Sequence, residues 1–210
     1  MLTLYDFPMA PSPRRARIAL AEKGVDHETV VVNLMEGEQL SESFRKINPQ
    51  CTVPALALPG GEVLTENAGI VAYLEAAYPN PPLLGTTPVE KGMIASWNVR
   101  CEFEGLLAIA EALRNRAEPM KGRALTGPEN YDQIPALAER GAQRLKAFWE
   151  KFDRHLEGRE FVAADQFSVA DITAVVAFDF ARVIKGQPAE DHAEIWRWRR
   201  GLDQRPSIAN

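Results

Sequence analysis

The feature that most constrains the fold is a change of pattern on either side of a proline-rich stretch. Residues 79–88 contain four prolines and a glycine, and proline interrupts helices because it lacks an N–H and fixes φ. Before this stretch, short runs typical of β-strands alternate with helical patterns, whereas after it only helical patterns occur. The sequence therefore predicts a first domain at residues 1–80, a linker at 81–88 and a second domain at 89–210.

The first region predicts the element order β-α-β-α-β-β-α. Strands are expected at residues 2–7, 27–34, 53–58 and 62–64, where Val, Leu and other strand-favouring residues gather. Helices are expected at residues 13–23, at 41–46 and in the segment that ends before Pro79. Ser12 and Pro13 form a suitable N-cap and first residue for the first of these helices.

The second region is predicted to be all helix. The expected helices cover residues 89–116, 134–156, 169–185 and 189–202. Ser168 and Asp171 form a capping pair at the start of the third helix, which is apolar on nearly all sides and therefore belongs at the centre of the domain. Trp196 and Trp198 are expected to pack rather than to bind a ligand. Together the two regions predict an α/β plus all-α fold.

Composition excludes several classes of function. The 210 residues are 46% hydrophobic and 25% charged, and a formal net charge of −5 without a basic run argues against nucleic-acid binding. The first residues carry no export signal, and no apolar run approaches the roughly 20 residues that span a bilayer. We therefore expect a soluble, cytoplasmic protein that does not enter a membrane. Cys51 and Cys101 lie far apart without a Cys/His cluster, so neither a disulfide framework nor a metal site is expected.

Four short segments carry a resemblance to a known family. They are YDFPMAPSPRRAR at residues 5–17, NPQCTVPAL at 48–56, LTENAGIVAYL at 64–74 and FSVADI at 167–172. Each is weak alone, but in this order and at these separations they resemble the cytosolic glutathione S-transferases of bacterial type, over nearly the whole chain. The resemblance implies a thioredoxin-like N-terminal domain with a mixed four-stranded sheet, followed by an all-helical bundle domain.

The same resemblance implies a glutathione site in the first domain. Val53 and Pro54 would be joined by a cis peptide bond, and the Val53 backbone would pair with the cysteinyl part of glutathione. Glu66 would meet the ammonium of the γ-glutamyl group, and Asn67, where the family more often has Ser, would hold its carboxylate at a helix N-terminus. The alternative is that Glu66 and Asn67 only cap the helix.

Cys51 stands where many relatives carry a basic or imidazole residue for the glycine carboxylate of glutathione. A neutral thiol does not replace that charge, so Gln39 and Gln50 are expected to donate hydrogen bonds in its place. A Cys51 that forms a mixed disulfide with glutathione is the alternative to a quiet buried thiol.

Ser12 is the residue that the resemblance assigns to the thiol of glutathione. The three arginines between residues 14 and 17 oppose the dipole of the first helical turn, so at least one should have an anionic partner, and Arg14 is the candidate for glutathione. Two other ways to hold the thiol stay open. One is Tyr5, which lies inside the first strand, and the other is a bound water held by polar groups of the helical domain, with candidates Asn98, Arg100 and Glu102.

The function implied is that of a glutathione transferase that stabilises the thiolate and conjugates it to a small hydrophobic electrophile, without a metal. The electrophile pocket is expected between the loop at residues 7–12 and the helix at 97–109, with Met9, Phe103 and Leu106. A role in detoxification and a twofold homodimer are also implied. Two alternatives are a non-catalytic glutathione-binding scaffold or ligand carrier, and a glutathione-dependent thiol oxidoreductase or peroxidase that would depend on Cys51. The identity of the physiological electrophile is left open.

Overall fold

The structure is a computed structural model that describes residues 1–209. The chain divides into two compact units. The first contains Met1–Pro81 together with Leu125–Asn130, and the second contains Pro82–Ala124 and the residues from Tyr131 onward. The grouping of residues 125–130 with the first unit has no counterpart in the sequence pattern, which places this segment between two predicted helices.

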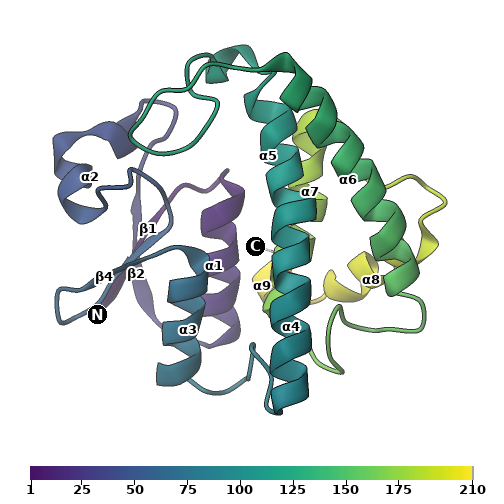
Figure 1. Cartoon of the computed structure of the whole chain (residues 1–210). Helices are drawn as coiled ribbons and strands as arrows, with labels where there is room; N and C mark the ends of the chain where they lie inside the picture. The colour runs from purple at the N-terminus through teal and green to yellow at the C-terminus, as the bar shows by residue number, and fades with distance from the viewer. Residues whose placement is uncertain (210) are drawn as a thin grey trace. The chain divides into compact units, whose positions relative to one another are not determined.

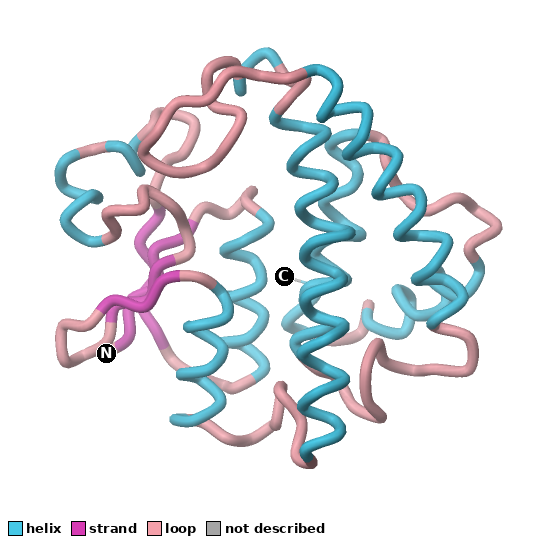
Figure 2. The backbone as a smooth tube through the Cα atoms, in the orientation of Figure 1, coloured by secondary structure: helices cyan, strands magenta, loops and turns pink. Residues whose placement is uncertain are grey.

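The first unit has the predicted element order, and its strands form one mixed sheet (Figure 2). The strand order is β2-β1-β3-β4. β1 pairs parallel to β2, with Tyr5 opposite Val30, and antiparallel to β3, which in turn pairs antiparallel to β4. The elements are β1 Leu2–Asp6, α1 Pro11–Glu22, β2 His27–Val31, the 3-10 turn η1 Glu38–Leu40, α2 Glu42–Ile47, β3 Ala55–Ala57, β4 Val63–Thr65 and α3 Asn67–Ala77.

Helices cover both faces of this sheet. α1 and α3 lie side by side on one face, with α2 on the opposite side (Figure 1). Among the fully buried side chains are Leu4 and Leu56 of the sheet and Ile70 and Leu74 of α3. On the α2 side, the Tyr5 ring meets that of Phe44 edge-on at 5.9 Å, within an apolar cluster that also includes Val32 and Val53. Packing of helices on both faces of the sheet holds its strands in place. The candidate site lies at the ends of these strands.

The first helix begins earlier than the sequence predicts. α1 starts at Pro11 with Ala10 as its N-cap, so the prediction of Ser12 as N-cap and Pro13 as first helical residue is wrong. The physical reason is that proline suits any position of the first turn, where an N–H has no helical partner and φ already has the right value. Pro11 and Pro13 therefore both fit inside the helix, and Ser12 becomes its second residue.

The second unit is helical. Its elements are α4 Pro88–Arg100, the π-helical segment η2 Cys101–Leu106, α5 Leu107–Arg114, the 3-10 turn η3 Glu118–Met120, α6 Pro135–His155, α7 Val169–Phe180, the 3-10 turn η4 Ala181–Ile184, α8 Ala193–Leu202 and α9 Pro206–Ala209. The helix predicted at residues 89–116 is thus interrupted by a π-helical turn. Among residues 1–209, no helix is both long enough and apolar enough to cross a membrane.

α7 is the centre of the second unit, as predicted. All its residues from Val169 to Phe178 are buried, and the predicted capping pair is present at its start. The Asp171 carboxylate accepts hydrogen bonds from the Val162 N–H at 2.9 Å and from the Ser168 N–H, the Ser168 hydroxyl and the Trp198 indole N–H, each at 3.1 Å. Burial raises the pKa of Asp171 to about 6, against the lowering effect of these hydrogen bonds.

The two tryptophans near the C-terminus pack, as predicted. The Trp198 ring is 1% exposed and meets Phe152 edge-on at 5.5 Å. The Trp196 ring meets Phe178 edge-on at 5.1 Å. Trp198 therefore belongs to the aromatic core around α7, and the half-buried Trp196 packs at the margin of this core.

Candidate functional site

Ser12 lies in the first turn of α1, where two side chains donate hydrogen bonds to its hydroxyl. The Asn67 Nδ2 atom, from the start of α3, lies 3.0 Å from Ser12 Oγ and 3.1 Å from the Ser12 carbonyl oxygen. The Arg15 Nη2 atom lies 3.3 Å from Ser12 Oγ. Because an oxygen that accepts from an amide and a guanidinium is polarised, its own O–H becomes a stronger donor. The structure thus brings Ser12 and Asn67 together.

The start of α1 is electropositive for reasons that the sequence supplies. Of the first three helical residues, positions 11 and 13 are prolines, so Ser12 alone contributes an N–H there. The first turn contains no acidic residue, so the positive end of the helix dipole is not offset locally. An anion placed at the Ser12 side chain would therefore be stabilised by the hydroxyl, the backbone N–H and the dipole together.

Arg17 has its anionic partner inside the protein. Its Nη1 atom lies 2.5 Å from Oδ1 of the buried Asp6, and its Nη2 atom donates to the Pro8 carbonyl at 3.0 Å. Arg17 therefore fixes the loop between β1 and α1 that leads to Ser12. Arg14, the predicted glutathione ligand, is half-buried in the same helical turn. The contribution of Arg15 to Ser12 was missed by the sequence analysis, although its place three residues after Ser12 on a helix is a usable signal.

Glu66 and Asn67 open α3 without capping it in the ordinary way. Glu66 is the N-cap, and its side chain makes no capping hydrogen bond. Its backbone has φ 61°, a conformation that costs a non-glycine residue about 1–3 kcal/mol and is concentrated at functional sites. The exposed Glu66 carboxylate and the first N–H groups of α3 are thus left for another partner. The Asn67 Oδ1 atom is buried and has no hydrogen-bond partner among residues 1–209.

The turn before β3 has the geometry that the resemblance predicts. The Val53–Pro54 peptide bond is cis, and β3 begins directly after it at Ala55. Gln50 is exposed on the preceding loop, and Gln39 lies in η1, where its buried Oε1 atom has no hydrogen-bond partner within the described part of the chain. Gly127 belongs to residues 125–130, which are grouped with the first unit, and it has φ 113°. It lies close to Gln50, because a Cβ added at Gly127 would be 3.7 Å from the Gln50 carbonyl oxygen.

The two cysteines show no sign of reactivity. Cys51 is 2% exposed, and its thiol lies 3.6 Å from the Pro49 carbonyl oxygen. Cys101 is fully buried in the second unit, where burial, followed by the negative charges of Asp171 and Glu104, raises the pKa of its thiol well above the ordinary value. A thiolate nucleophile at either residue has no support from this arrangement.

The three predicted electrophile residues come from both units. Met9, on the β1–α1 loop, is 70% exposed, and Phe103, on η2, is 55% exposed. Leu106, at the end of η2, is buried. Of the polar candidates on the same helix, Asn98 accepts a hydrogen bond from the Thr173 hydroxyl at 2.6 Å and the Arg100 guanidinium lies 5.1 Å from the Trp97 ring. Between residues 1 and 209, no three His, Cys, Asp or Glu side chains are grouped so that they would hold a metal ion.

The architecture of the two units defines a class of protein. A mixed four-stranded sheet with helices on both faces and a cis-proline turn ahead of β3 is a thioredoxin-like unit, and an all-helical unit follows it. Two family models match the chain: "Glutathione S-transferase, N-terminal domain" over residues 10–77 and "Glutathione S-transferase, C-terminal domain" over residues 135–201.

Individual relatives match over the whole chain. Glutathione S-transferase 2 of Saccharomyces cerevisiae is 37% identical over 209 residues, which cover 99% of this chain and 88% of the relative. The crystal structure of a glutathione S-transferase domain-containing protein from Marinobacter aquaeolei superposes with a TM-score of 0.90 at 32% identity, over 98% of this chain and 99% of that one. Gtt2 from Saccharomyces cerevisiae superposes with a TM-score of 0.89 at 34% identity, over 99% and 98%. The chain therefore belongs to the glutathione S-transferase family of enzymes.

Proposed function

We propose that this enzyme binds glutathione at the starts of α1, β3 and α3, stabilises its thiolate at Ser12 and conjugates it to a small hydrophobic electrophile. The observation that carries the proposal is the hydrogen bonding of Ser12. With Asn67 and Arg15 donating to its oxygen, the Ser12 hydroxyl keeps its own hydrogen for a thiolate. A bond of this kind contributes about 1.5–3 kcal/mol, and 1.4 kcal/mol lowers a thiol pKa by about one unit.

The remaining groups of glutathione fit the other residues of the site. The γ-glutamyl carboxylate is held by the backbone N–H of Asn67 and the positive end of α3, since the Asn67 Nδ2 group already donates to two oxygen atoms of Ser12. Its ammonium meets the Glu66 carboxylate, which no capping bond engages. The Val53 backbone pairs with the cysteinyl residue. Gln39 and Gln50 serve the glycine carboxylate in place of a basic residue at Cys51, and Arg14 is proposed as a further glutathione ligand.

The reaction is a displacement or addition by sulfur. The thiol proton leaves to solvent and the sulfur electron pair forms a bond to the electrophilic carbon. In a displacement, a halide or other leaving group departs with the electron pair of the broken bond. In an addition, no group leaves, and the electron pair of the broken π bond takes up a proton from solvent. Met9, Phe103 and Leu106 are proposed to line the electrophile pocket. Met9 and Phe103 each expose a large apolar side chain that an apolar substrate could contact, whereas Leu106 is buried.

The first experiment is a near-UV difference spectrum during titration with glutathione at pH about 6.5, two units below the pKa of a free cysteine thiol. A saturable thiolate band is the expected result. If calorimetry shows binding but no band appears, the enzyme holds glutathione as a scaffold or carrier without activating it.

The variant Ser12→Ala tests whether the Ser12 hydroxyl is the group that donates a hydrogen bond to the glutathione thiolate. We expect the pKa of the bound thiol to rise by about 1–2 units, which would lower kcat/KM at pH 6.5 by about 10–100-fold. Thr29→Val removes a hydroxyl from the exposed edge strand β2 of the same unit and should change neither quantity. A normal thiolate band in Ser12→Ala would assign activation to another group, such as a bound water.

The assembly and location belong to the same proposal. We infer a cytoplasmic, twofold homodimer that acts in detoxification, on the strength of family membership. Cys51 and Cys101 are both free thiols, as is usual in a reducing compartment. Light scattering tests the assembly, and a monomer at micromolar concentration would contradict it.

A further inference from the structure

The π-helical segment η2 leaves a backbone carbonyl without its usual partner. The Leu107 N–H, which in an α-helix would donate to Phe103, donates instead to the Glu102 carbonyl oxygen, five residues back. The Phe103 carbonyl oxygen therefore lacks its usual helical donor and is open to another one. Single π-helical turns inside α-helices occur frequently at functional sites.

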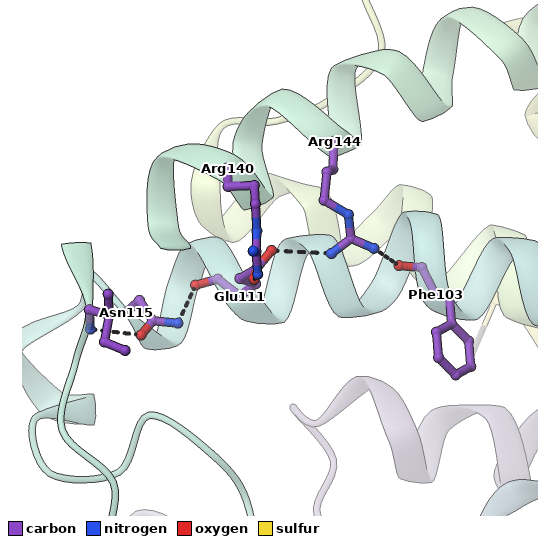
Figure 3. Close-up of polar contacts among 6 residues, drawn as sticks. Phe103, Glu111, Asn115, Arg140 and Arg144 are labelled. Carbon is purple, nitrogen blue, oxygen red and sulfur yellow. Dashed lines mark hydrogen bonds and ion pairs between the residues drawn. The ribbon is translucent and has the colours of Figure 1, made fainter. Parts of the chain in front are cut away.

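Arg144 of α6 supplies that donor, as Figure 3 shows. Its Nη2 atom lies 2.6 Å from the Phe103 carbonyl oxygen, and its Nη1 atom lies 3.1 Å from Oε2 of Glu111 on α5. The other Glu111 oxygen pairs with Arg140. The Glu111 backbone oxygen accepts from Asn115 at 3.0 Å. The guanidinium of Arg144 is thus held between an ion pair and the carbonyl that the π-helical turn exposes.

The Phe103 side chain is left outside this network. Its ring points away from the arginines of α6 (Figure 3) and is 55% exposed. A helical side chain takes its direction from the backbone turn that carries it. The contact between Arg144 and the Phe103 carbonyl therefore acts on the direction of the Phe103 ring without touching the ring.

We propose that Arg144 is a positioning residue for the electrophile, one that fixes the π-helical turn and with it the ring of Phe103. This inference rests on the proposed function. A flat ring held in one direction favours an aromatic electrophile, which it meets in an offset-stacked or edge-on arrangement. Arg144 should therefore contribute to the affinity of the enzyme for an aromatic electrophile such as the aryl halide 1-chloro-2,4-dinitrobenzene.

The decisive comparison is between Arg144→Met and Arg140→Met. Both remove a guanidinium from Glu111, but only Arg144 also holds the Phe103 carbonyl. We expect Arg144→Met to raise KM for 1-chloro-2,4-dinitrobenzene about 5–10-fold, a change of about 1–1.4 kcal/mol, with KM for glutathione within about twofold of wild type. Arg140→Met should leave both KM values unchanged. Equal effects of the two variants on KM would overturn the proposal and leave Arg144 as a link between helices only.

Two further variants separate positioning from folding. Arg144→Lys keeps a donor for the Phe103 carbonyl and should recover part of the loss in KM, which also covers the case in which Arg144→Met does not fold. Phe103→Ala should reproduce the KM change of Arg144→Met, and the double variant should be no worse than Phe103→Ala alone. Additive losses would show that Arg144 does not act through Phe103.

A binding assay distinguishes failure of this inference from failure of the proposed function. The fluorescent arene 8-anilinonaphthalene-1-sulfonate is titrated into each variant in the absence of turnover. Weaker binding by about fivefold in both Phe103→Ala and Arg144→Met, with Arg140→Met unchanged, supports the positioning role even if wild type conjugates nothing. Unchanged probe binding in Arg144→Met overturns it even if wild type is an active transferase.

Discussion

The N-termini of α7 and α3, one helix from each unit, are used in opposite ways. At the start of α7, Asp171 accepts four hydrogen bonds from within its own unit, so the polar groups there are satisfied internally. At the start of α3, the Glu66 side chain makes no capping bond and Asn67 turns toward Ser12 instead. The polar groups at the start of α7 stabilise the fold, whereas those at the start of α3 are available to a ligand.

The difference shows how to separate structural motifs from binding motifs. Polar residues at a helix N-terminus are common to both, so residue type alone does not discriminate. What discriminates is whether the hydrogen-bonding capacity is used inside the protein and whether the backbone is relaxed. Glu66 has φ 61°, whereas Ser168 has φ −143° in the extended region that any residue adopts. Substitutions at the start of α7 should therefore affect folding, and those at the starts of α1 and α3 should affect glutathione binding.

Asp171→Ala should show the largest effect. It leaves the Val162 and Ser168 N–H groups and the Trp198 indole N–H buried without their acceptor, at about 1–3 kcal/mol for each unsatisfied donor. We expect the free energy of unfolding to fall by about 3–5 kcal/mol, as measured by urea denaturation. Glu42→Ala, which removes an exposed acid from the first turn of α2, is the matched control and should cost less than about 1 kcal/mol. If the two variants were equally stable, the α7 start would not be the structural motif described above.

Gly141→Ala should have the next largest effect on stability. A Cβ at Gly141 of α6 would lie 2.6 Å from the Ala108 carbonyl oxygen and 2.8 Å from the Ala112 nitrogen of α5. The two helices would have to separate, which costs about 1–3 kcal/mol in a packed core. Gly92→Ala on α4 meets no atom within 4 Å and should stabilise the chain by up to about 1 kcal/mol. Thermal unfolding measures both, and an unchanged melting temperature in Gly141→Ala would mean that α5 and α6 lie further apart in solution.

Much of the fold followed from the sequence because periodicity and proline placement are local signals. The order β-α-β-α-β-β-α and the buried α7 were predicted from runs of residues that are neighbours along the chain. The start of α1 was not predicted correctly, because Pro11 and Pro13 are equally suited to the first turn of a helix. The π-helical turn at Cys101–Leu106 was not either, because no proline or other local signal in residues 89–116 marks it.

The candidate site was predictable in its residues but not in its contacts. The resemblance supplied Ser12, Asn67 and the cis bond before Pro54, and the structure brings Ser12 and Asn67 together across 55 positions of sequence. The hydrogen bonds that the Asn67 side chain donates to Ser12 cannot be predicted from the sequence neighbours of Asn67. The contact between Arg144 and the Phe103 carbonyl spans 41 positions and likewise has no local signal.

Glu66→Gly should separate the stability of the first unit from its affinity. Glycine adopts positive φ readily, so the free energy of unfolding should stay unchanged or rise by about 1 kcal/mol. Loss of the carboxylate should weaken glutathione binding by about tenfold, or about 1.4 kcal/mol. Glu66→Ala is the control that loses the carboxylate and keeps the strained backbone, so it should bind as weakly without the gain in stability. Calorimetric titration decides the point, and wild-type affinity in Glu66→Gly would remove Glu66 from the site.

Glu111→Gln should give the smallest effect, visible in its pH dependence. Burial raises the pKa of the Glu111 carboxyl, but the hydrogen bonds and charges of Arg140 and Arg144 outweigh it and hold the pKa below the ordinary value of 4.5. Because the folded chain then binds the proton less tightly than the unfolded chain, the stabilisation is present in full above pH 4.5 and is lost as the pH falls through the folded-state pKa. The difference in unfolding free energy between wild type and Glu111→Gln should therefore be largest near neutral pH and shrink in acid, while Glu139→Gln, at an exposed position of α6, should differ little from wild type throughout. Both arginines are partly exposed, so salt should reduce the difference as well. A difference that is independent of pH would mean that Glu111 does not bridge the two arginines in solution, and that Arg144 holds the Phe103 carbonyl without its support.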